Sequence, residues 1–516
     1  MTAIQVHARE ALFIPRKHIP IAAIDELRDK LTFRFYNEKS CDKCEYKVER
    51  HNPEVCDECA AFMGGAQLME EVKVGKKAYI KTPIGNPQIL INTLKEHNIS
   101  VSGIKPHFPT QAMSKRVKFT GTLREYQPAA VKAMIEKKRG VLKAPPRSGK
   151  TVMSTAAICK IGMKTIIMAS QRDWLVGFQE TFIGSDTQKA LTNISKDKIG
   201  FAKTYEDFLK YDVCLVTCQT FWSEKGKALL RKVRDMFAVI VVDEIHTGAA
   251  PKYANVLASI NCRWKIGLSG TPNRKDGRFV LMRNLIGPVI YEAKVQRLRP
   301  HVSLVRTNYT ANHKGGVLWT RMVSAIEKDP KRLKLIAEWA IKDAKAGHMV
   351  LIPLSQITPI KALVMAINKI AGKKLAYAFT GQLGSQLDKK TGKKRKQRDI
   401  YIEAARNYKL KILVGTGKLL STGINIPRAS CIYDVTMSSN MENCEQRVSR
   451  ILTPLDGKPT PKLRIFLDDS NVRRKCLANE WWGCINPKFR PVISEVDLQT
   501  LRGYFSNKDQ LKKLEL

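Results

Sequence analysis

The sequence has no run of about 18 apolar residues, which is the length that a membrane-spanning helix requires. We therefore expect no membrane span. The start, MTAIQVHAREALFIP, also lacks the basic region and apolar stretch that together mark a secretory signal. These two absences predict a protein that stays in the cytoplasm.

Acidic residues are scarce. Asp and Glu number 47 against 89 Lys and Arg, which gives a formal net charge of +42. An ordinary soluble surface carries both signs of charge, whereas an excess this large attracts polyanions over long distances. A ribosome-like or merely soluble basic protein is the alternative. We favour nucleic acid as the partner.

The chain is too long for a single hydrophobic core. Its 516 residues, of which 44% are hydrophobic, predict two to four domains with ordinary cores. The pattern of the sequence changes along the chain and divides it into four segments: residues 1–110, 111–298, 299–465 and 466–516. We expect the last to be a tail packed on the third segment.

Two Cys-x-x-Cys pairs occur in the first segment. Cys41 and Cys44 are separated by a polar spacer from Cys56 and Cys59, a spacing typical of a zinc knuckle. Four thiolates leave no open coordination position, so the Zn²⁺ would be structural. Unrelated core cysteines are the alternative, but the spacer is too polar for a core. His51 could replace one ligand but is not needed. We predict a small zinc-containing α+β domain that binds nucleic acid.

A phosphate-binding loop is predicted at residues 141–151, which read VLKAPPRSGKT. An apolar strand precedes the loop and a helix follows it, which is the context that a phosphate cradle needs. Lys150 would reach the β- and γ-phosphates, and Thr151 would offer a hydroxyl to Mg²⁺. A short Gly-Lys-Thr can arise by chance, so the assignment needs support elsewhere.

Support comes from an all-apolar strand at residues 237–242 that ends in two carboxylates. Asp243 would hold Mg²⁺ through water, and Glu244 would orient or deprotonate the water that attacks the γ-phosphate. Strands and helices alternate here, and the polar motifs follow the strands, where parallel α/β sheets bind ligands. The alternation begins again near residue 300. The sequence therefore predicts two parallel α/β units.

In content and order these motifs resemble those of superfamily 2 helicases and translocases of DExH type, from about residue 120 to about residue 460. The resemblance implies two tandem RecA-like lobes and nucleic-acid-stimulated hydrolysis of ATP with Mg²⁺. It assigns ATP binding to Tyr126, Gln127, Pro146, Arg147, Ser148, Gly149, Lys150, Thr151, Gly423 and Asn425. Among these, Gln127 would read adenine. It assigns catalysis to Lys150, Asp243, Glu244, Arg447 and Arg450, the two arginines reaching the γ-phosphate from the second lobe.

The resemblance also covers the motifs that contact nucleic acid and those that transmit the effect of hydrolysis. Contacts to the nucleic-acid backbone fall to Gln171, Arg172, Thr217, Gln219, Thr220 and Thr416. Coupling of hydrolysis to strand movement falls to His246, Ser269, Thr271 and Gln446.

Three sites depart from the family pattern. Pro146 and Arg147 replace a common Thr-Gly pair, Asn425 stands where Asp is common, and Thr453 stands where a last arginine is frequent. Because Lys150 and both carboxylates remain, we expect hydrolysis to survive.

Within the superfamily, the spellings VVDEIHTG and GLSGTP are most similar to phage fork-remodelling and recombination helicases, similar in role to RecG and UvsW. This implies a phage-encoded DNA helicase or translocase, active in the host cytoplasm on branched or duplex DNA in replication, recombination or repair, with proteins of replication or recombination as partners. An RNA helicase is one alternative, because backbone contacts do not identify the sugar. A zinc-dependent clamp without catalysis is another. A nuclease-coupled restriction motor is weaker, since no convincing set of nuclease residues is present.

Two further features stay open. The basic run KKTGKKRKQR at residues 389–398 is either a solvated loop or a sequence-independent contact to phosphates. Trp481 and Trp482 either stack on a base or pack the tail onto the second lobe.

Overall fold

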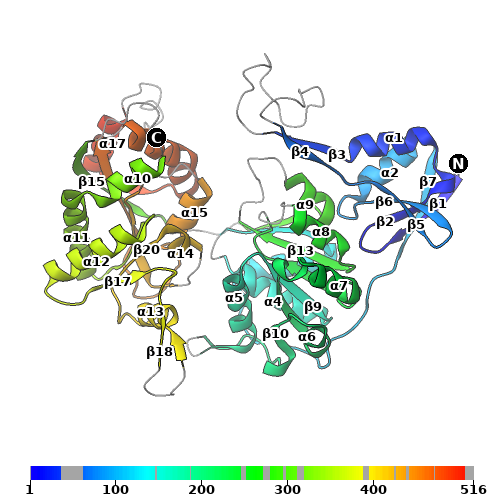
Figure 1. Cartoon of the computed structure of the whole chain (residues 1–516), viewed down its shortest axis with the longest axis horizontal. Coiled ribbons are helices and arrows are strands. Elements are labelled where there is room, and N and C mark those ends of the chain that lie inside the picture. The colour runs from blue at the N-terminus through cyan, green and yellow to red at the C-terminus, as the bar shows by residue number, and fades with distance from the viewer. Residues whose placement is uncertain are drawn as a thin grey trace, which may run out of the picture. The chain divides into compact units, whose positions relative to one another are not determined.

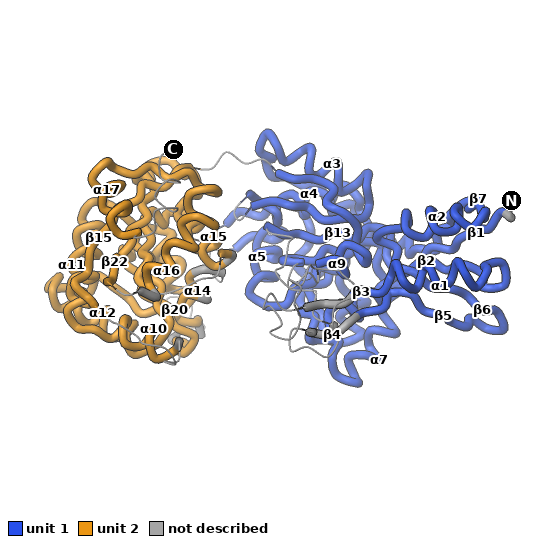
Figure 2. The backbone as a smooth tube through the Cα atoms, turned by 90° about the horizontal axis from the view of Figure 1, so that it is seen from above, with its two compact units in different colours: residues 1–295 blue, residues 296–516 orange. Residues whose placement is uncertain are grey.

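The computed structural model describes residues 2–36, 62–145, 148–185, 188–245, 251–270, 279–293, 298–310, 319–387, 394–422, 426–436, 441–469 and 471–505. The chain divides into two compact units, residues 1–295 and 296–516 (Figure 2). None of the helices in these described ranges is both long and apolar enough to cross a bilayer.

Unit 1 begins with a small α+β domain, in which two helices cover one face of a mixed sheet (Figure 1). The strand order is β5-β6-β2-β1-β7. The core between sheet and helices is apolar, with Val6, Ile14, Leu27, Ile80 and Leu94 all fully buried. The elements are β1 (Thr2–Ala8), β2 (Leu12–Pro15), η1 (Arg16–His18), α1 (Ile21–Lys30), β5 (Glu70–Val74), β6 (Lys77–Thr82), α2 (Pro87–Glu96) and β7 (Ile99–Pro106).

A two-stranded antiparallel ribbon, β3 (Thr32–Tyr36) and β4 (Phe62–Gln67), leaves this domain (Figure 1). Tyr36 pairs with Phe62 at the far end of the ribbon. At the near end, Phe33 and Ala66 pack against the hydrophobic core of the next domain. The four cysteines of the predicted zinc knuckle lie between the two strands, outside the described residues.

The small domain is attached to the first lobe by polar contacts as well. The Gly85 amide donates to the Asn284 carbonyl over 2.7 Å, and a Cβ at position 85 would stand 2.4 Å from that oxygen. The Asn261 amide donates to the His107 carbonyl over 3.0 Å. Glycine at position 85 is therefore required for this close approach, and the small domain and the first lobe form one unit.

The first lobe is a seven-stranded, all-parallel sheet in the order β10-β11-β9-β12-β13-β8-β14. Every residue of β9 and β12 is buried, as expected for parallel strands covered on both faces. The elements are α3 (Gln127–Lys137), β8 (Arg139–Lys143), α4 (Lys150–Ile161), β9 (Thr165–Ala169), α5 (Arg172–Ile183), η2 (Lys196–Lys198), β10 (Ile199–Phe201), α6 (Tyr205–Lys210), β11 (Val213–Thr217), η3 (Cys218–Phe221), α7 (Glu224–Val233), β12 (Val239–Val242), α8 (Pro251–Ser259), β13 (Trp264–Ser269), α9 (Phe279–Ile286) and β14 (Val289–Glu292).

Unit 2 holds a second seven-stranded parallel sheet, in the order β17-β20-β16-β21-β22-β15-β23. The prediction of two parallel α/β lobes is confirmed. The elements are β15 (His301–Thr310), α10 (Trp319–Lys328), α11 (Pro330–Lys345), β16 (Met349–Leu354), α12 (Ile357–Ala371), β17 (Ala376–Phe379), β18 (Ser385–Leu387), β19 (Lys394–Lys396), α13 (Gln397–Arg406), β20 (Ile412–Thr416), α14 (Gly417–Thr422), β21 (Ala429–Asp434), α15 (Met441–Ser449), β22 (Lys462–Asp469), α16 (Asn471–Glu480), the π-helix η5 (Trp481–Phe489), β23 (Val492–Ile493) and α17 (Glu495–Tyr504).

The C-terminal segment is part of the second lobe. The boundary expected between residues 465 and 466 falls inside β22, and β23 joins the edge of the same sheet. Trp481 is 2% exposed within the main core of the lobe, so it packs there and does not offer its ring to a base. In the basic run, the described residues from Lys394 to Lys396 form β19, which pairs with β18.

Candidate nucleotide site

The predicted phosphate loop joins β8 to α4 at the carboxyl edge of the first sheet. Gly149 precedes the first residue of α4 with φ of +82°, a left-handed conformation that glycine adopts without strain. A Cβ at this position would also lie 2.5 Å from the Gln127 amide nitrogen. The backbone geometry therefore favours glycine here, and any larger residue would also displace the Gln127 amide.

Two side chains from the start of α3 brace this loop. The Tyr126 hydroxyl donates to the Ser148 carbonyl over 2.6 Å, and the Gln127 amide nitrogen donates to the same oxygen over 2.9 Å. The Gln127 amide oxygen accepts from the Arg124 backbone amide at 2.9 Å. Both ends of the Gln127 amide are thus used within the protein. The role of Gln127 in reading adenine stays a prediction.

A comparison of ATP with GTP tells whether Gln127 reads the adenine base or holds the phosphate loop in place. We expect Gln127→Ala to weaken binding of ATP and GTP by the same factor, because the loop that grips the phosphates loses a hydrogen bond worth about 0.5–1.5 kcal/mol. Competition against a fluorescent ATP analogue would measure both affinities. Glu136→Ala, at an exposed position near the end of the same helix, serves as the control. A loss confined to ATP would instead assign Gln127 to the base.

Lys150 and two carboxylates meet beside the loop. The Lys150 amine lies 3.3 Å from a Glu244 carboxylate oxygen and 3.4 Å from the Ala144 carbonyl. Glu244 has φ of +45°, a conformation that is uncommon for a residue other than glycine. The site thus places an amine and two carboxyl groups where strand β12 ends, at the position expected from the sequence.

Asp243 is the more deeply placed carboxylate. Burial, together with the neighbouring Glu244 charge and against the attraction of Lys150, raises the pKa of Asp243 to about 7. A bound divalent cation would reverse this shift by favouring the charged carboxylate. Carboxylate and hydroxyl oxygens suit Mg²⁺, so Asp243 and the Thr151 hydroxyl at the start of α4 fit the metal that the sequence predicts.

The segments assigned to nucleic-acid contact lie on neighbouring strands of the same sheet. β11 pairs with β9 up to Thr217 opposite Ala169, and the Gln219 amide donates to the Ser170 carbonyl over 2.8 Å. The Thr217 and Thr220 hydroxyls are 3.3 Å apart. Two motifs that are far apart in the sequence therefore form one surface.

Arg172 and Gln171 extend this surface at the start of α5. Gln171 is the N-terminal cap residue of the helix. The Arg172 guanidinium lies 3.6 Å from the centre of the Phe201 ring, a cation–π contact that holds the side chain in place. Strand β13, which lies between β12 and β8, ends at Ser269, and the Ser269 carbonyl accepts from the Ala144 amide at 2.9 Å. This bond gives Ser269 a direct connection to the loop.

The remaining assigned residues of the described chain lie in unit 2. Thr416 ends β20, and Gln446 and Arg447 are in α15, with Arg450 directly after it. Arg447 is 5% exposed, and its guanidinium contacts Glu480 at 3.0 Å and Asp434 at 3.6 Å. The Arg447 side chain is thus held inside its own lobe. Its role at the γ-phosphate stays a prediction.

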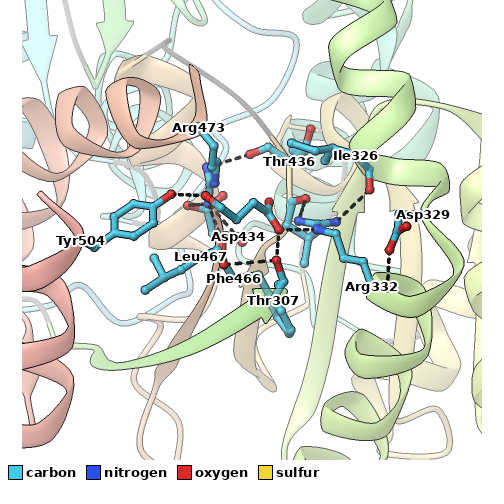
Figure 3. Close-up of polar contacts among 12 residues, drawn as sticks. Thr307, Ile326, Asp329, Arg332, Asp434, Thr436, Phe466, Leu467, Arg473 and Tyr504 are labelled. Carbon is cyan, nitrogen blue, oxygen red and sulfur yellow. Dashed lines mark hydrogen bonds and ion pairs between the residues drawn. The ribbon is translucent and has the colours of Figure 1, made fainter. Parts of the chain in front are cut away.

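Asp434 also belongs to a buried charge cluster at the carboxyl ends of β21 and β22, whose contacts around Arg473 and Arg332 are drawn in Figure 3. Arg473 lies 3.1 Å from Asp434 and donates to the Thr436 carbonyl over 3.0 Å. Arg332 donates to Asp468 over 2.8 Å. Sequence reasoning missed the partners of Arg447, although the position of Asp434 directly at a strand end is the same signal that marked Asp243.

Ten predicted site residues fall outside the described residues: Pro146, Arg147, His246, Thr271, Gly423, Asn425, Cys41, Cys44, Cys56 and Cys59. Within the ranges that are described, no cluster of three or more His, Cys, Asp or Glu residues could hold a metal ion.

Two family models match this chain. Residues 120–274 match "Type III restriction enzyme, res subunit", and residues 351–452 match "Helicase conserved C-terminal domain". Each matched range lies within one of the two parallel-sheet lobes, and together they include the phosphate loop, both carboxylates and α15. The two lobes are therefore helicase-type domains.

Two individual relatives share less than a quarter of their aligned residues with this chain. A helicase/translocase subunit XPB of the general transcription and DNA repair factor IIH, from Antonospora locustae, is 23% identical over 64% of this chain and 48% of its own length. The probable helicase D10 of Escherichia phage T5 is 24% identical over 62% of this chain and 66% of its own length. This chain therefore spans about half to two thirds of the length of these relatives. The crystal structure of T4 UvsW is 17% identical with a TM-score of 0.38, covering 96% of this chain and 99% of that one.

Proposed function

We propose that this chain, a DExH-type protein of helicase superfamily 2, uses ATP hydrolysis to move along DNA and to unwind or remodel branched or duplex DNA. The observation that carries the proposal is the meeting of Lys150, Asp243 and Glu244 beside the phosphate loop. The choice of DNA as the nucleic acid, of branched DNA as the substrate, and of replication, recombination or repair as the process are all part of the proposal.

The contact between Lys150 and Glu244 suggests how nucleotide starts the cycle. The γ-phosphate competes for the Lys150 amine, which frees the Glu244 carboxylate to accept a hydrogen bond from the attacking water. Mg²⁺ held by Asp243 and Thr151 would neutralise charge that develops on the phosphate oxygens. Tyr126 and Gln127 both donate hydrogen bonds to the Ser148 carbonyl, and these bonds would keep that oxygen turned away from the phosphates.

Movement along a strand needs contacts that do not depend on sequence. Arg172 and the hydroxyl and amide groups of Thr217, Gln219 and Thr220 suit phosphate and sugar oxygens, which carry no base identity. The net charge of +42 adds long-range attraction to any polyanion. Affinity for nucleic acid is then expected to fall steeply with salt.

We also propose that Cys41, Cys44, Cys56 and Cys59 bind one structural zinc ion. The antiparallel pairing of β3 with β4 supports this, because Tyr36 opposite Phe62 brings both ends of the cysteine segment to neighbouring positions. Purified protein should contain one zinc per chain by elemental analysis, and Cys44→Ser with Cys59→Ser should lose it. Cys159→Ser, at a buried cysteine of the first lobe, should keep it. Wild-type protein without zinc after reconstitution would contradict the proposal.

A substrate comparison tests the main proposal. One preparation would be given a DNA fork, a four-way junction, a tailed DNA duplex and an RNA duplex, and ATP-dependent strand separation would be measured. We expect activity on at least one branched DNA. Activity on RNA alone would assign the chain to RNA, and tight binding without ATP turnover would favour a non-catalytic clamp.

A further inference from the structure

Among the described residues of the N-terminal domain, α1 and α2 both cover the same face of the sheet (Figure 1). Leu12, Ile14 and Ile80 point to the face that α1 and α2 cover, where they are at most 1% exposed. Side chains alternate between the two faces along a strand, so Phe13 and Tyr79 point to the opposite face. Both are half-buried, as rings lying on a sheet would be. This opposite face is called the open face below.

The pairing register brings aromatic and basic residues together on the open face. His7 pairs with Phe13, and Phe13 pairs with Lys81 on the next strand. Lys105 pairs with His7 from the other side. These pairs place Lys105, His7, Phe13 and Lys81 in one row across four strands, with an aromatic ring at its centre.

Tyr79 occupies the next row. It pairs with Pro15 and is therefore a diagonal neighbour of Phe13 across β2 and β6. Such diagonal neighbours are about 7–8 Å apart, a spacing at which two rings can each meet a different base. The two rings thus form a pair of apolar platforms on one surface.

The charge around the rings is positive. Lys77 and Lys105 have exposed side chains, and Lys81 is bound to Glu70 at 2.8 Å. His107 adds a ring to the edge of the face, 5.3 Å from the ring of His7. Aromatic faces bordered by lysines match the bases and phosphates of a single strand, whereas a duplex would offer phosphates alone to this surface.

We propose that the open face binds single-stranded DNA, with bases stacked on Phe13 and Tyr79 and backbone phosphates bound by Lys77 and Lys105. The inference rests on the proposed action on DNA. It adds a second contact site for the strand, on the domain that precedes the motor, and gives that domain a defined binding surface. Stacking does not distinguish between bases, so the contact would be sequence-independent.

Photochemical cross-linking tests the contact directly. An oligothymidylate carrying 5-iododeoxyuridine would be bound to the full chain without ATP and irradiated, and the adducts would be mapped by peptide mass spectrometry. We expect adducts on the peptides that contain Phe13 or Tyr79. Adducts confined to the two motor lobes would overturn the proposal.

Matched variants separate stacking from charge and from folding. Phe13→Leu with Tyr79→Leu keeps apolar bulk but removes both π faces, and binding of the oligonucleotide should weaken at least about 5-fold and up to roughly 100-fold. Phe13→Tyr with Tyr79→Phe keeps the rings and should bind as wild type. Tyr205→Leu, at a 37% exposed ring on α6, is the control for loss of an unrelated aromatic.

Salt dependence gives a second signature. Each phosphate contact of a single strand contributes about 0.7 to the slope of log affinity against log salt. Lys77→Gln and Lys105→Gln should each lower that slope by about this amount, while the leucine pair at Phe13 and Tyr79 should leave it unchanged. If the lysine variants weaken binding and the leucine pair at Phe13 and Tyr79 does not, the open face contacts phosphates without stacking on bases, and the proposal of stacking is overturned.

Failure of this inference can be told from failure of the proposed function. If DNA does not stimulate ATP hydrolysis by the wild-type chain, the proposed function is wrong. If it does, and the leucine pair at Phe13 and Tyr79 binds single strands as wild type, the open face is not a binding site.

Discussion

Replacing Lys150 by alanine should lower ATP turnover by about 10²–10³-fold, because the variant lacks a positive charge that is already in place to stabilise the negative charge developing on the phosphate. The structure places the Lys150 amine 3.3 Å from Glu244 at the carboxyl edge of the sheet, where a bound γ-phosphate would find it. Steady-state phosphate release, with and without single-stranded DNA, measures the effect.

Glu244→Gln tests the other side of the same contact. A glutamine keeps the size of the side chain but does not accept a proton from the attacking water, so we expect a fall in turnover of about 10²–10⁴-fold. Nucleotide binding should persist, since Lys150 and the loop are intact. The combination of retained binding and lost turnover is the signature of a residue that acts on the water.

A second ion pair at the same sheet edge provides controls for both variants. Lys143 ends β8 and lies 2.7 Å from Glu292 at the end of β14, with both side chains more than one third exposed. Lys143→Ala and Glu292→Gln should keep turnover near the wild-type value. If Lys150→Ala or Glu244→Gln stayed within tenfold of wild type, the site assignment would be wrong.

The parts of this site that the sequence predicted are local ones. Strand, glycine, lysine and helix follow one another within a few residues around Lys150, and Asp243 and Glu244 directly follow an apolar strand. Such patterns report the carboxyl edge of a parallel sheet because the chemistry and the fold are encoded in the same short segment.

The parts that the sequence did not predict depend on contacts between distant segments. The hydrogen bond from Gln127 to the Ser148 carbonyl joins the start of α3 to the phosphate loop. Neither segment has a sequence pattern that predicts this contact with the other. Arg447 is held by Glu480 from a C-terminal segment that carries little periodicity. The open face of the N-terminal sheet required the register of short strands, which places Phe13 beside residues far away in the sequence.

Arg473 and Arg474 are adjacent residues of α16, but the first has a buried side chain and the second a partly exposed one. Arg473 has a fully buried side chain and lies 3.1 Å from the equally buried Asp434. Arg474 lies 2.9 Å from Asp469, with side chains 35% and 51% exposed. Two methionine substitutions at adjacent positions therefore compare a buried and an exposed ion pair in one helix.

Arg473→Met should destabilise unit 2 by about 3–5 kcal/mol, because it leaves an uncompensated carboxylate in the core. For a unit of this size that loss lowers Tm by roughly 6–20 °C. Arg474→Met should cost about 0–1 kcal/mol, as exposed pairs do. Thermal unfolding of the full chain, followed by calorimetry, measures both.

The cluster around Arg473 makes the penalty depend on pH. Arg332, Arg447 and Arg473 face Asp434, Asp468 and Glu480, so loss of one arginine leaves one excess negative charge. Burial, against the attraction of Arg447, raises the pKa of Glu480 to about 7 already in the wild-type protein. The variant can therefore restore neutrality by binding a proton there.

A carboxyl group whose pKa is higher in the folded than in the unfolded protein lowers the stability of the folded state as the pH rises from the unfolded-state pKa to the folded-state pKa. The destabilisation caused by Arg473→Met should therefore be smallest near pH 5 and grow toward pH 8. Adding Asp434→Asn removes the excess charge, so the double variant should recover part of the lost Tm at pH 8 and little at pH 5. A penalty that is independent of pH, or a double variant less stable than Arg473→Met alone at pH 8, would show that packing and not charge fixes α16 on the sheet.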